Sequence, residues 1–268
     1  MGAGSMAETI QGDRARYAAP WHGSMPLIWM YHSVAPYEQD PYQVTVRPER
    51  FEQQMSWLRR RGWRGVSVRE MLEARAIGCG QGLVGLTFDD GYLDFAACAL
   101  PVLKRYGFSA TVYVIAGRLG GDNEWDPEGP RKPLMTAELV RQVADAGIEI
   151  GSHGLRHVSL PTAPKAALAG EIVGSRRVLQ GISGQDVRGV CYPYGHIDAA
   201  VVAGVRGAGY DYGCAIWPSE HTGRGALPRT FIGESDTGPR LSAKGLRHWL
   251  TWNYRGPGAR HGTRPETS

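Results

Sequence analysis

Short apolar runs alternate with segments of helical periodicity along most of the 268-residue sequence, and this alternation constrains the fold more than any other feature. Runs such as Leu83 to Phe88 and Ala110 to Ile115 are apolar and rich in β-branched residues, as is typical of buried strands. The segments between them space apolar residues by three or four, as at Phe51, Met55 and Leu58, which predicts helices with one buried face. Strand–helix alternation of this kind predicts an α/β fold with a parallel sheet covered by helices, and the number of units suits a barrel.

The expected strands are short and largely apolar, and they span residues 26–31, 83–88, 110–115, 148–152, 187–192 and 212–216. The expected helices lie between them and begin at about Pro48, Phe95, Thr136, Lys165 and Ala199. Glycines follow several of these helical segments, as Gly107 and Gly147 do, and glycine is the residue that most often ends a helix.

A single domain over residues 25–255 is the economical interpretation, because no linker-like break divides this region and no internal repeat is found in it. Residues 1–24 are polar and rich in Gly and Ala, and they predict a flexible N-terminal arm. Residues 256–268 contain almost no apolar side chains and predict a disordered tail. The length is sufficient for a substantial core.

Charge and cysteine usage exclude several classes of protein. The net charge of +4 is small, and its excess arginines lie partly near the two ends, whereas a nucleic-acid binder concentrates its charge on one face. The four cysteines are too widely spaced for a zinc knuckle or a redox motif, so buried, reduced thiols are expected. No apolar signal segment and no membrane-spanning stretch is found, which predicts a cytoplasmic protein.

Asp89 and Asp90 directly follow an expected strand, in the sequence Thr-Phe-Asp-Asp-Gly-Tyr. Adjacent carboxylates at a strand end point in different directions, so one can bind a cation while the other handles protons. A simple turn is an equally consistent interpretation, since Asp and Gly are both turn formers. The position favours chemistry, because active sites of parallel α/β folds lie where strands run out into loops, as they do again at His153 and Tyr194.

His153 and His157 have the spacing H-x-x-x-H after another expected strand. Two imidazoles and one carboxylate, with positions left for water, match a catalytic metal site; a structural site would need a further ligand, and no cysteine is placed to supply it. Tyr194 lies in a Pro–aromatic–Gly turn that can expose a backbone N–H, although a tight loop of structural importance alone has the same pattern.

Taken together, TFDDGY at 87–92, SH-x-x-x-H at 152–157 and YPYG at 192–195 resemble, in order and separation, the polysaccharide deacetylase family, carbohydrate esterase family four. The likeness runs from Pro26 to about Ile232 and is closest to the branch with an M-Y-H-S-V strand, here residues 30–34. The resemblance implies a single-domain distorted (β/α)7-type barrel. It also implies hydrolysis of an N-acetyl group by a metal-activated water.

The resemblance implies a role for each motif residue. Asp89 matches the general base, and Tyr194 matches the residue whose backbone N–H helps hold the oxyanion. The matching metal ligands are Asp90, His153 and His157. A divalent metal ion is therefore the implied cofactor, zinc first, with cobalt, nickel or manganese also accepted by such ligands.

Two departures from the family pattern concern the groups around the base. Many members carry an arginine just before the aromatic–Pro–Tyr turn, where it pairs with the base, but here that neighbourhood holds Val190 and Cys191. We hypothesise that Arg229 makes this pairing instead. The C-terminal Leu-x-His that supplies the general acid in other members is also absent. His32 matches the histidine that does this work in the present branch; its rivals are His196 and His221.

The sequence favours an N-deacetylase acting on an acetylated amino sugar or a sugar-containing metabolite. An amidohydrolase or acyl esterase acting on a non-sugar small molecule would use the same residues. A catalytically silent, carbohydrate-binding barrel is the third hypothesis, against which the intact ligand and base set argues. Trp125, His196 and Trp217 are candidate substrate-binding residues, although core packing is the commoner fate of a tryptophan. No nucleic-acid partner is expected, and the sequence does not specify an oligomer.

Overall fold

A computed structural model describes residues 24–254 of the chain. Its main sheet has eight strands in the order β10-β1-β5-β6-β7-β8-β9, with β4 paired to β5 beside this path, and every described pairing within it is parallel. The strands are β1 (Ile28–Tyr31), β4 (Arg64–Val66), β5 (Leu83–Phe88), β6 (Thr111–Val114), β7 (Glu149–Ser152), β8 (Gly189–Cys191), β9 (Tyr212–Cys214) and β10 (Thr230–Phe231). An isolated parallel bridge between Cys214 and Leu227 lies on the remaining side, between β9 and the segment that leads to β10.

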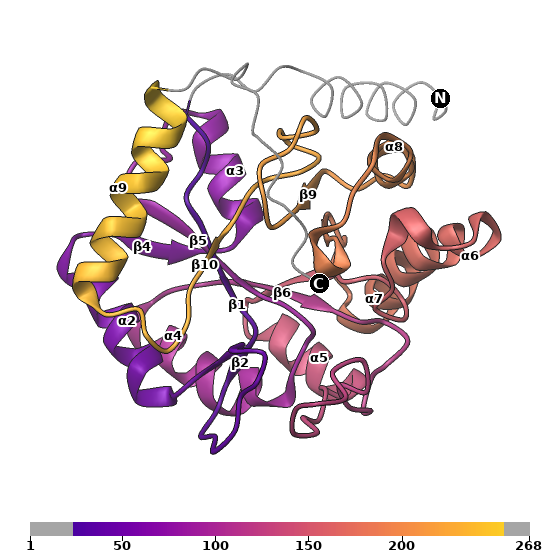
Figure 1. Ribbon diagram of the computed structural model, residues 1–268, viewed down its shortest axis with the longest axis horizontal. Coiled ribbons are helices and arrows are strands. Elements are labelled where there is room, and N and C mark those ends of the chain that lie inside the picture. Colours follow the sequence, from indigo (N-terminus) through magenta and orange to yellow (C-terminus); the bar gives the residue numbers. More distant parts are fainter. Residues whose placement is uncertain (1–23, 255–268) are drawn as a thin grey trace, which may run out of the picture.

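Helices surround the strands, which lie at the centre of the view in Figure 1. They are α2 (Pro48–Arg60), α3 (Val68–Ala76), α4 (Leu100–Tyr106), α5 (Ala137–Asp145), α6 (Lys165–Ala169), α7 (Ser175–Ser183), α8 (Ala199–Gly207) and α9 (Gly238–Tyr254). Two π-helical segments, η1 (Phe95–Ala99) and η3 (Gly170–Gly174), continue directly into α4 and α7, and two short 3-10 segments are η2 (Leu160–Thr162) and η4 (Pro193–Gly195). A small parallel sheet pairs β2 (Ser33–Val34) with β3 (Thr45–Val46).

The expected strand–helix alternation is confirmed, with strand ends shifted by a few residues. Residues 83–88 form β5 as expected, whereas the other expected strands are shorter. The helix expected to begin at Lys165 is interrupted by η3 and ends at Ser183. The elements that were not expected include the short strands β4 and β10 and the helices α3 and α9. The Ser67 side chain caps α3 by accepting a hydrogen bond from the Glu70 N–H.

The expected N-terminal arm and C-terminal tail lie outside the described residues, apart from Ser24. The division of the chain at 24/25 and 255/256 therefore stays a prediction. Among residues 24–254, no helix combines the length and the apolar character that crossing a membrane requires.

Aromatic packing fixes the two strands that carry the first site residues. Tyr31 at the end of β1 stacks on Phe88 at the end of β5, with ring centroids 5.2 Å apart, and Phe51 of α2 packs edge-on against both rings. All three rings are fully buried. Since β1 and β5 pair in register at Tyr31 and Phe88, the next residues along each strand, His32 and Asp89, emerge side by side at the same edge of the sheet.

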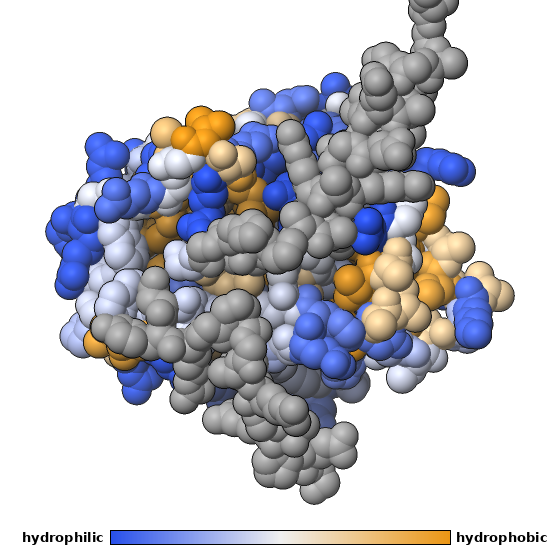
Figure 2. All heavy atoms as spheres, turned by 90° about the horizontal axis from the view of Figure 1, so that it is seen from above, coloured by the Kyte–Doolittle hydropathy of each residue, from blue (hydrophilic) through white to orange (hydrophobic). Residues whose placement is uncertain are grey.

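Hydrophilic residues cover much of the surface in the view from above (Figure 2). Figure 2 shows one face on which apolar residues gather in separate patches between hydrophilic ones. Exposed apolar side chains include Ile77, just after α3, and Leu246 of α9. Scattered apolar groups of this size are usual on soluble proteins and do not by themselves indicate a binding surface.

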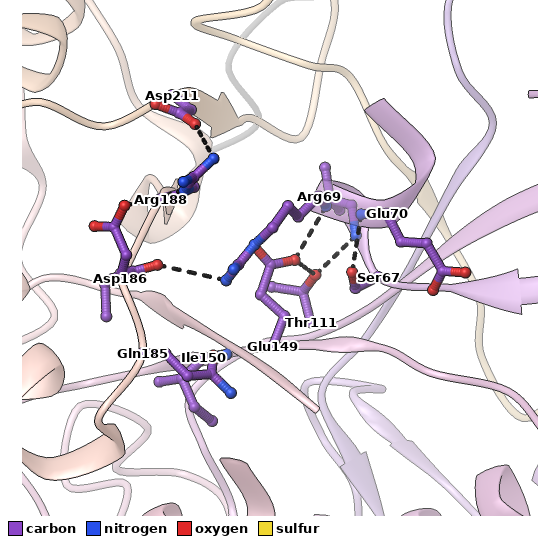
Figure 3. A network of polar contacts seen from close by, with 12 residues as sticks. Ser67, Arg69, Glu70, Thr111, Glu149, Ile150, Gln185, Asp186, Arg188 and Asp211 are labelled. Carbon is purple, nitrogen blue, oxygen red and sulfur yellow. Dashed lines mark hydrogen bonds and ion pairs between the residues drawn. The ribbon is translucent and has the colours of Figure 1, made fainter. Parts of the chain in front are cut away.

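A buried carboxylate links several elements at the amino-terminal ends of the strands. The candidate active-site residues lie at the opposite, carboxyl ends. Glu149, the first residue of β7, is only 5% exposed. Its carboxylate accepts hydrogen bonds from the Thr111 hydroxyl (2.6 Å), the Tyr212 hydroxyl (2.9 Å) and the backbone N–H of Arg69 (3.1 Å). Figure 3 shows the contacts of Glu149 with Thr111 and Arg69, and the Arg69 guanidinium also reaches the backbone oxygen of Asp186. Glu149 therefore ties α3 to β6, β7 and β9.

Replacing Glu149 by Ala is expected to lower the free energy of unfolding by about 2 to 3 kcal/mol, because buried hydroxyl and amide donors lose their acceptor. The measurement is urea unfolding at neutral pH. Asp145→Ala is the control, since this carboxylate pairs with Arg141 on an exposed helix face and its loss should cost no more than about 0.5 kcal/mol. Equal stability of the Glu149 variant and the wild type would contradict the structural role.

Candidate active site

The carboxyl ends of neighbouring strands bring the motif residues together. His32 follows β1, Asp89 and Asp90 follow β5, and His153 follows β7. Tyr194 lies in η4, just after β8. Because all these strands are parallel, their carboxyl ends meet at one edge of the sheet, where active sites of such folds lie.

Asp90, His153 and His157 converge as a candidate metal site. Asp90 Oδ1 lies 3.4 Å from His153 Nε2 and 3.4 Å from His157 Nε2, and all three side chains are buried. Ligands about 2.0 to 2.1 Å from a tetrahedral cation lie roughly 3.3 Å from each other, so this separation fits. Asp90 Oδ1 is fully buried and has no hydrogen-bond partner among the described residues. An orphaned carboxylate oxygen facing two imidazole nitrogens is what a divalent cation would satisfy.

The outer nitrogen of each imidazole is held by a partner, which leaves Nε2 directed at Asp90. His153 Nδ1 lies 2.8 Å from the backbone carbonyl oxygen of Cys191, to which it can donate. His157 Nδ1 lies 3.2 Å from the Tyr194 hydroxyl. Such contacts fix the orientation and the tautomer of a metal-binding histidine. Asp90 and His157 both have positive φ, 69° and 61°, a conformation that non-glycine residues adopt mainly where the surroundings hold them.

In the metal-free protein, the shifted pKa values of Asp90 and His157 favour the protonation states that bind a cation. Burial alone would raise the pKa of Asp90, but its interactions with the nearby imidazoles of His153 and His157 hold it below its usual range. Burial lowers the pKa of His157 to about 4, which keeps the imidazole neutral and able to bind a cation. Burial also opposes protonation of His153, but Cys191 and Asp90 raise its pKa, so a cation would have to displace that proton.

Asp89 makes the pairing with Arg229 that the sequence suggested. Arg229 Nη1 donates to Asp89 Oδ1 at 2.6 Å and Nη2 donates to Oδ2 at 2.8 Å, with both side chains buried. Burial would raise the pKa of Asp89, but the charge and hydrogen bonds of Arg229 lower it. The guanidinium is itself held by Thr87 Oγ1 and by the carbonyl of Ala215. Asp89 is therefore an ionised carboxylate beside the candidate metal ligands.

Cys191 also lies in this cluster, and sequence reasoning assigned it no part. Its sulfur lies 3.0 Å from Arg229 Nη2 and 3.5 Å from Asp89 Oδ2. A cation bound between Asp89, His153 and Cys191 would compete with the guanidinium already there, so this second grouping does not suit a metal. The expectation of buried thiols holds for Cys191 and Cys214 but is wrong for Cys79, which is exposed in the loop after α3.

Of the three candidate acids, His32 is the one in contact with the base. His32 Nε2 lies 3.9 Å from Asp89 Oδ2, its side chain is 18% exposed, and its Nδ1 has no partner among the described residues. His196 instead pairs with Ser159, and His221 lies 3.8 Å from the exposed Glu220. The geometry therefore favours His32.

Aromatic side chains flank the candidate metal ligands. The rings of Trp125 and Tyr194 each lie 4.6 Å from the ring of His157, and His196 lies 5.8 Å beyond Tyr194. Tyr194 is 44% exposed, so its ring is accessible from solvent. Trp217 is 67% exposed, and no aromatic contact links it to this group within residues 24–254. Of the three candidate substrate-binding residues, the structure brings Trp125 and His196 to the site region.

Comparison with known proteins places the chain in a family. A family model described as polysaccharide deacetylase matches residues 78–213, which is half of the chain and contains Asp89, Asp90 and both metal-site histidines. The chain belongs to the polysaccharide deacetylase family. Members of this family are hydrolases that generally depend on a divalent metal, and the Asp90 site provides for one here.

Individual relatives support this assignment. The chain is 27% identical to YxkH of Bacillus subtilis over 224 residues, which cover 82% of this chain and 75% of that protein. It is 33% identical over 148 residues to the poly-β-1,6-N-acetyl-D-glucosamine N-deacetylase of Escherichia coli, where the match covers 50% of this chain and 21% of that protein. It is 23% identical to the enzyme of the same name from Staphylococcus aureus, covering 64% of this chain and 61% of that one.

Solved structures confirm the fold. The Streptococcus pyogenes deacetylase PplD superposes with a TM-score of 0.69 at 24% identity, covering 82% of this chain and 97% of that one. A de-N-acetylase from Aggregatibacter actinomycetemcomitans gives a TM-score of 0.70 at 19% identity, covering 81% and 98%. The expected (β/α)7-type barrel is therefore correct.

Proposed function

We propose that this deacetylase removes the N-acetyl group from an acetylated amino sugar. One observation carries the proposal: a buried, unpartnered carboxylate oxygen of Asp90 faces two imidazoles, while the adjacent Asp89 is kept ionised by Arg229. The relatives named as poly-β-1,6-N-acetyl-D-glucosamine N-deacetylases support an N-acetylglucosamine unit as the substrate class.

The two carboxylates have separate roles in this proposal. Asp90, with His153 and His157, would hold a divalent cation, and we favour zinc over cobalt, nickel or manganese. When bound, the cation supplies a Lewis acid that polarises the acetyl carbonyl and makes a water more acidic. Asp89 accepts the proton that this water loses as its oxygen adds to the acetyl carbon. The guanidinium of Arg229 holds Asp89 in the orientation for this step and keeps it unprotonated beforehand.

Two further groups complete the reaction. The backbone N–H of Tyr194 donates to the oxygen that becomes negative as the carbonyl carbon turns tetrahedral. A protonated His32, whose Nε2 lies 3.9 Å from Asp89 Oδ2, donates to the departing nitrogen, so the C–N bond breaks to give a neutral amine and acetate. This proton is required because an amide anion is a very poor leaving group.

The aromatic surroundings favour a sugar over a non-sugar amide. The rings of Trp125 and Tyr194 each lie beside the ring of His157, and His196 lies next to Tyr194, whose side chain is exposed. Flat aromatic faces are suited to the apolar faces of sugar rings. We propose that these rings bind the sugar to which the acetamido group is attached.

The test is acetate release from N-acetylated glucosamine oligomers and from acetylated non-sugar amides and esters, with and without a metal chelator. We expect hydrolysis of the sugar substrates, a loss of at least about 100-fold on chelation, and recovery on addition of zinc. Full activity after complete metal removal would contradict the proposal. Preference for non-sugar substrates would replace it by the amidohydrolase or esterase alternative, and zinc binding without any turnover would indicate a silent barrel.

A further inference from the structure

Glu171 is a buried carboxylate that lies outside every motif of the sequence and holds the turn between the two metal-site histidines. It is on η3 and only 1% exposed. Its Oε2 accepts hydrogen bonds from the backbone N–H groups of Leu155 (2.7 Å) and Arg156 (3.1 Å). Its Oε1 accepts a third from the Arg156 guanidinium, at 2.8 Å. A charged carboxylate receiving two backbone amides makes strong, short hydrogen bonds.

The other backbone groups of this turn have different partners. The Gly154 N–H donates to Ser152 Oγ, and the carbonyl oxygens of Gly154 and Leu155 accept from the N–H groups of Ala116 and Gly117. The amides of residues 155 and 156 therefore depend on Glu171. The Glu171 carboxylate lies close to the backbone of this turn. A Cβ added to Gly154, which has a φ of +78°, would lie 3.2 Å from Glu171 Oε2.

Glu171 is itself fixed to the strand that carries His153. Ser175 Oγ lies 2.5 Å from the backbone oxygen of Glu171 and 2.8 Å from Ser152 Oγ, at the end of β7. The π-helical segment and the histidine turn are thus connected twice, once through the Glu171 carboxylate and once through the two serines. All of these side chains are buried.

We propose that Glu171 is a positioning residue that sets the affinity of the protein for its divalent cation without touching it. The proposal rests on the metal site proposed above. His157 must adopt a positive φ of 61° for its Nε2 to reach Asp90. Anchoring of the two preceding amides holds the turn in the conformation that allows this. Without the anchor, His153 stays at the end of β7 while His157 samples other positions, and the ligand set opens.

Three variants separate the contributions of the carboxylate. Glu171→Ala removes every contact of the carboxylate and leaves the serine contacts of the backbone in place. Glu171→Gln keeps one oxygen that can accept both backbone amides, and it loses only the ion pair with Arg156, whose side chain is 53% exposed and can turn to water. Arg156→Ala is the matched control, since it removes the ion pair and leaves both amides on Glu171.

The experiment is a zinc titration of the metal-free proteins against a competing chelator. We expect Glu171→Ala to raise the Kd for zinc about 10- to 100-fold. Glu171→Gln and Arg156→Ala should stay within about threefold of the wild type, as expected for loss of a solvent-exposed ion pair. At saturating zinc, kcat and KM of Glu171→Ala should return close to wild-type values, because the residue does not touch the substrate.

Hydrogen exchange of residues 153–158 gives a second measurement, in which the amides of Leu155 and Arg156 should exchange faster in Glu171→Ala than in the other two variants. If the Ala variant does not fold, Glu171→Asp, which is one methylene too short, replaces it with the same expectation. An unchanged zinc Kd in Glu171→Ala, or an equal loss in Arg156→Ala, would overturn the inference. A wild-type protein that binds no zinc would instead overturn the proposed function.

Discussion

Replacement of Asp89 by Asn is expected to lower kcat about 10²- to 10⁴-fold while the protein still binds its metal. The amide keeps the shape of the carboxylate and can still accept a hydrogen bond from Arg229, but it cannot accept the proton of the attacking water. The candidate metal ligands are untouched, because the orphaned oxygen belongs to Asp90. The measurement pairs a steady-state acetate-release assay with a zinc titration.

Asp90→Asn is the matched control, since it makes the same chemical change one residue along the chain. It should lose zinc affinity and activity together, because its oxygen is the one that faces both imidazoles. The contrast between the two variants tests the division of roles. Most of the wild-type rate in Asp89→Asn, or loss of zinc from it with retention in Asp90→Asn, would show that the base and the ligand are assigned the wrong way round.

The meeting of the candidate metal ligands could be predicted from the sequence because their positions depend on local pattern. Asp89 and Asp90 directly follow the run of residues 83–88, which forms β5 as expected. His153 likewise follows a β-strand. Once the strands are parallel, their carboxyl ends must meet, so residues 63 positions apart, such as Asp90 and His153, come together without any long-range information.

Arg229 could be suspected only through the family resemblance. Its guanidinium reaches Asp89 from a segment 140 residues away, and the sequence showed only that an arginine was missing next to Tyr192. Its neighbour Cys191 gave no signal, since a buried thiol is common in any core. Glu171 was not found at all, because it binds backbone amides, and backbone amides have no sequence pattern.

The elements that were not expected have weak patterns for physical reasons. β4 begins with an exposed Arg64 and contains Gly65, so its three residues do not form an apolar run. β10 has two residues, and its place is set by pairing with β1. The helix α9 leaves Leu246 and Leu250 exposed, so its apolar residues do not mark a single buried face. Tertiary pairing determines such segments more than local preference does.

Arg229→Met is expected to lower the free energy of unfolding by about 3 to 5 kcal/mol at neutral pH, because it leaves the Asp89 carboxylate buried and uncompensated. The two charges form a bidentate pair with both partners buried, in contrast to the exposed ion pairs of the surface helices. Activity should fall as well, since an unheld base no longer points at the reacting water. Arg229→Lys keeps one positive charge without the two-pronged geometry and should lose less stability.

The effect of Arg229→Met on the free energy of unfolding should depend on pH. In the wild type, Arg229 lowers the pKa of Asp89 below the value of about 3.9 that an aspartate has in the unfolded chain. The ion pair therefore stabilises the fold fully at pH values above about 3.9. This stabilisation is lost as the pH falls through the lower pKa that Asp89 has in the folded protein. Without Arg229, burial dominates and the pKa of Asp89 rises above its unfolded value. The stability difference between wild type and Arg229→Met should therefore be largest at neutral pH and shrink toward pH 4, and the acid limb of the activity profile should move to higher pH.

Urea unfolding of the metal-free proteins at both pH values and a pH–rate profile measure the two effects. A stability loss that is the same at both pH values, with an unshifted acid limb, would mean that Arg229 acts through packing and does not control the charge of Asp89.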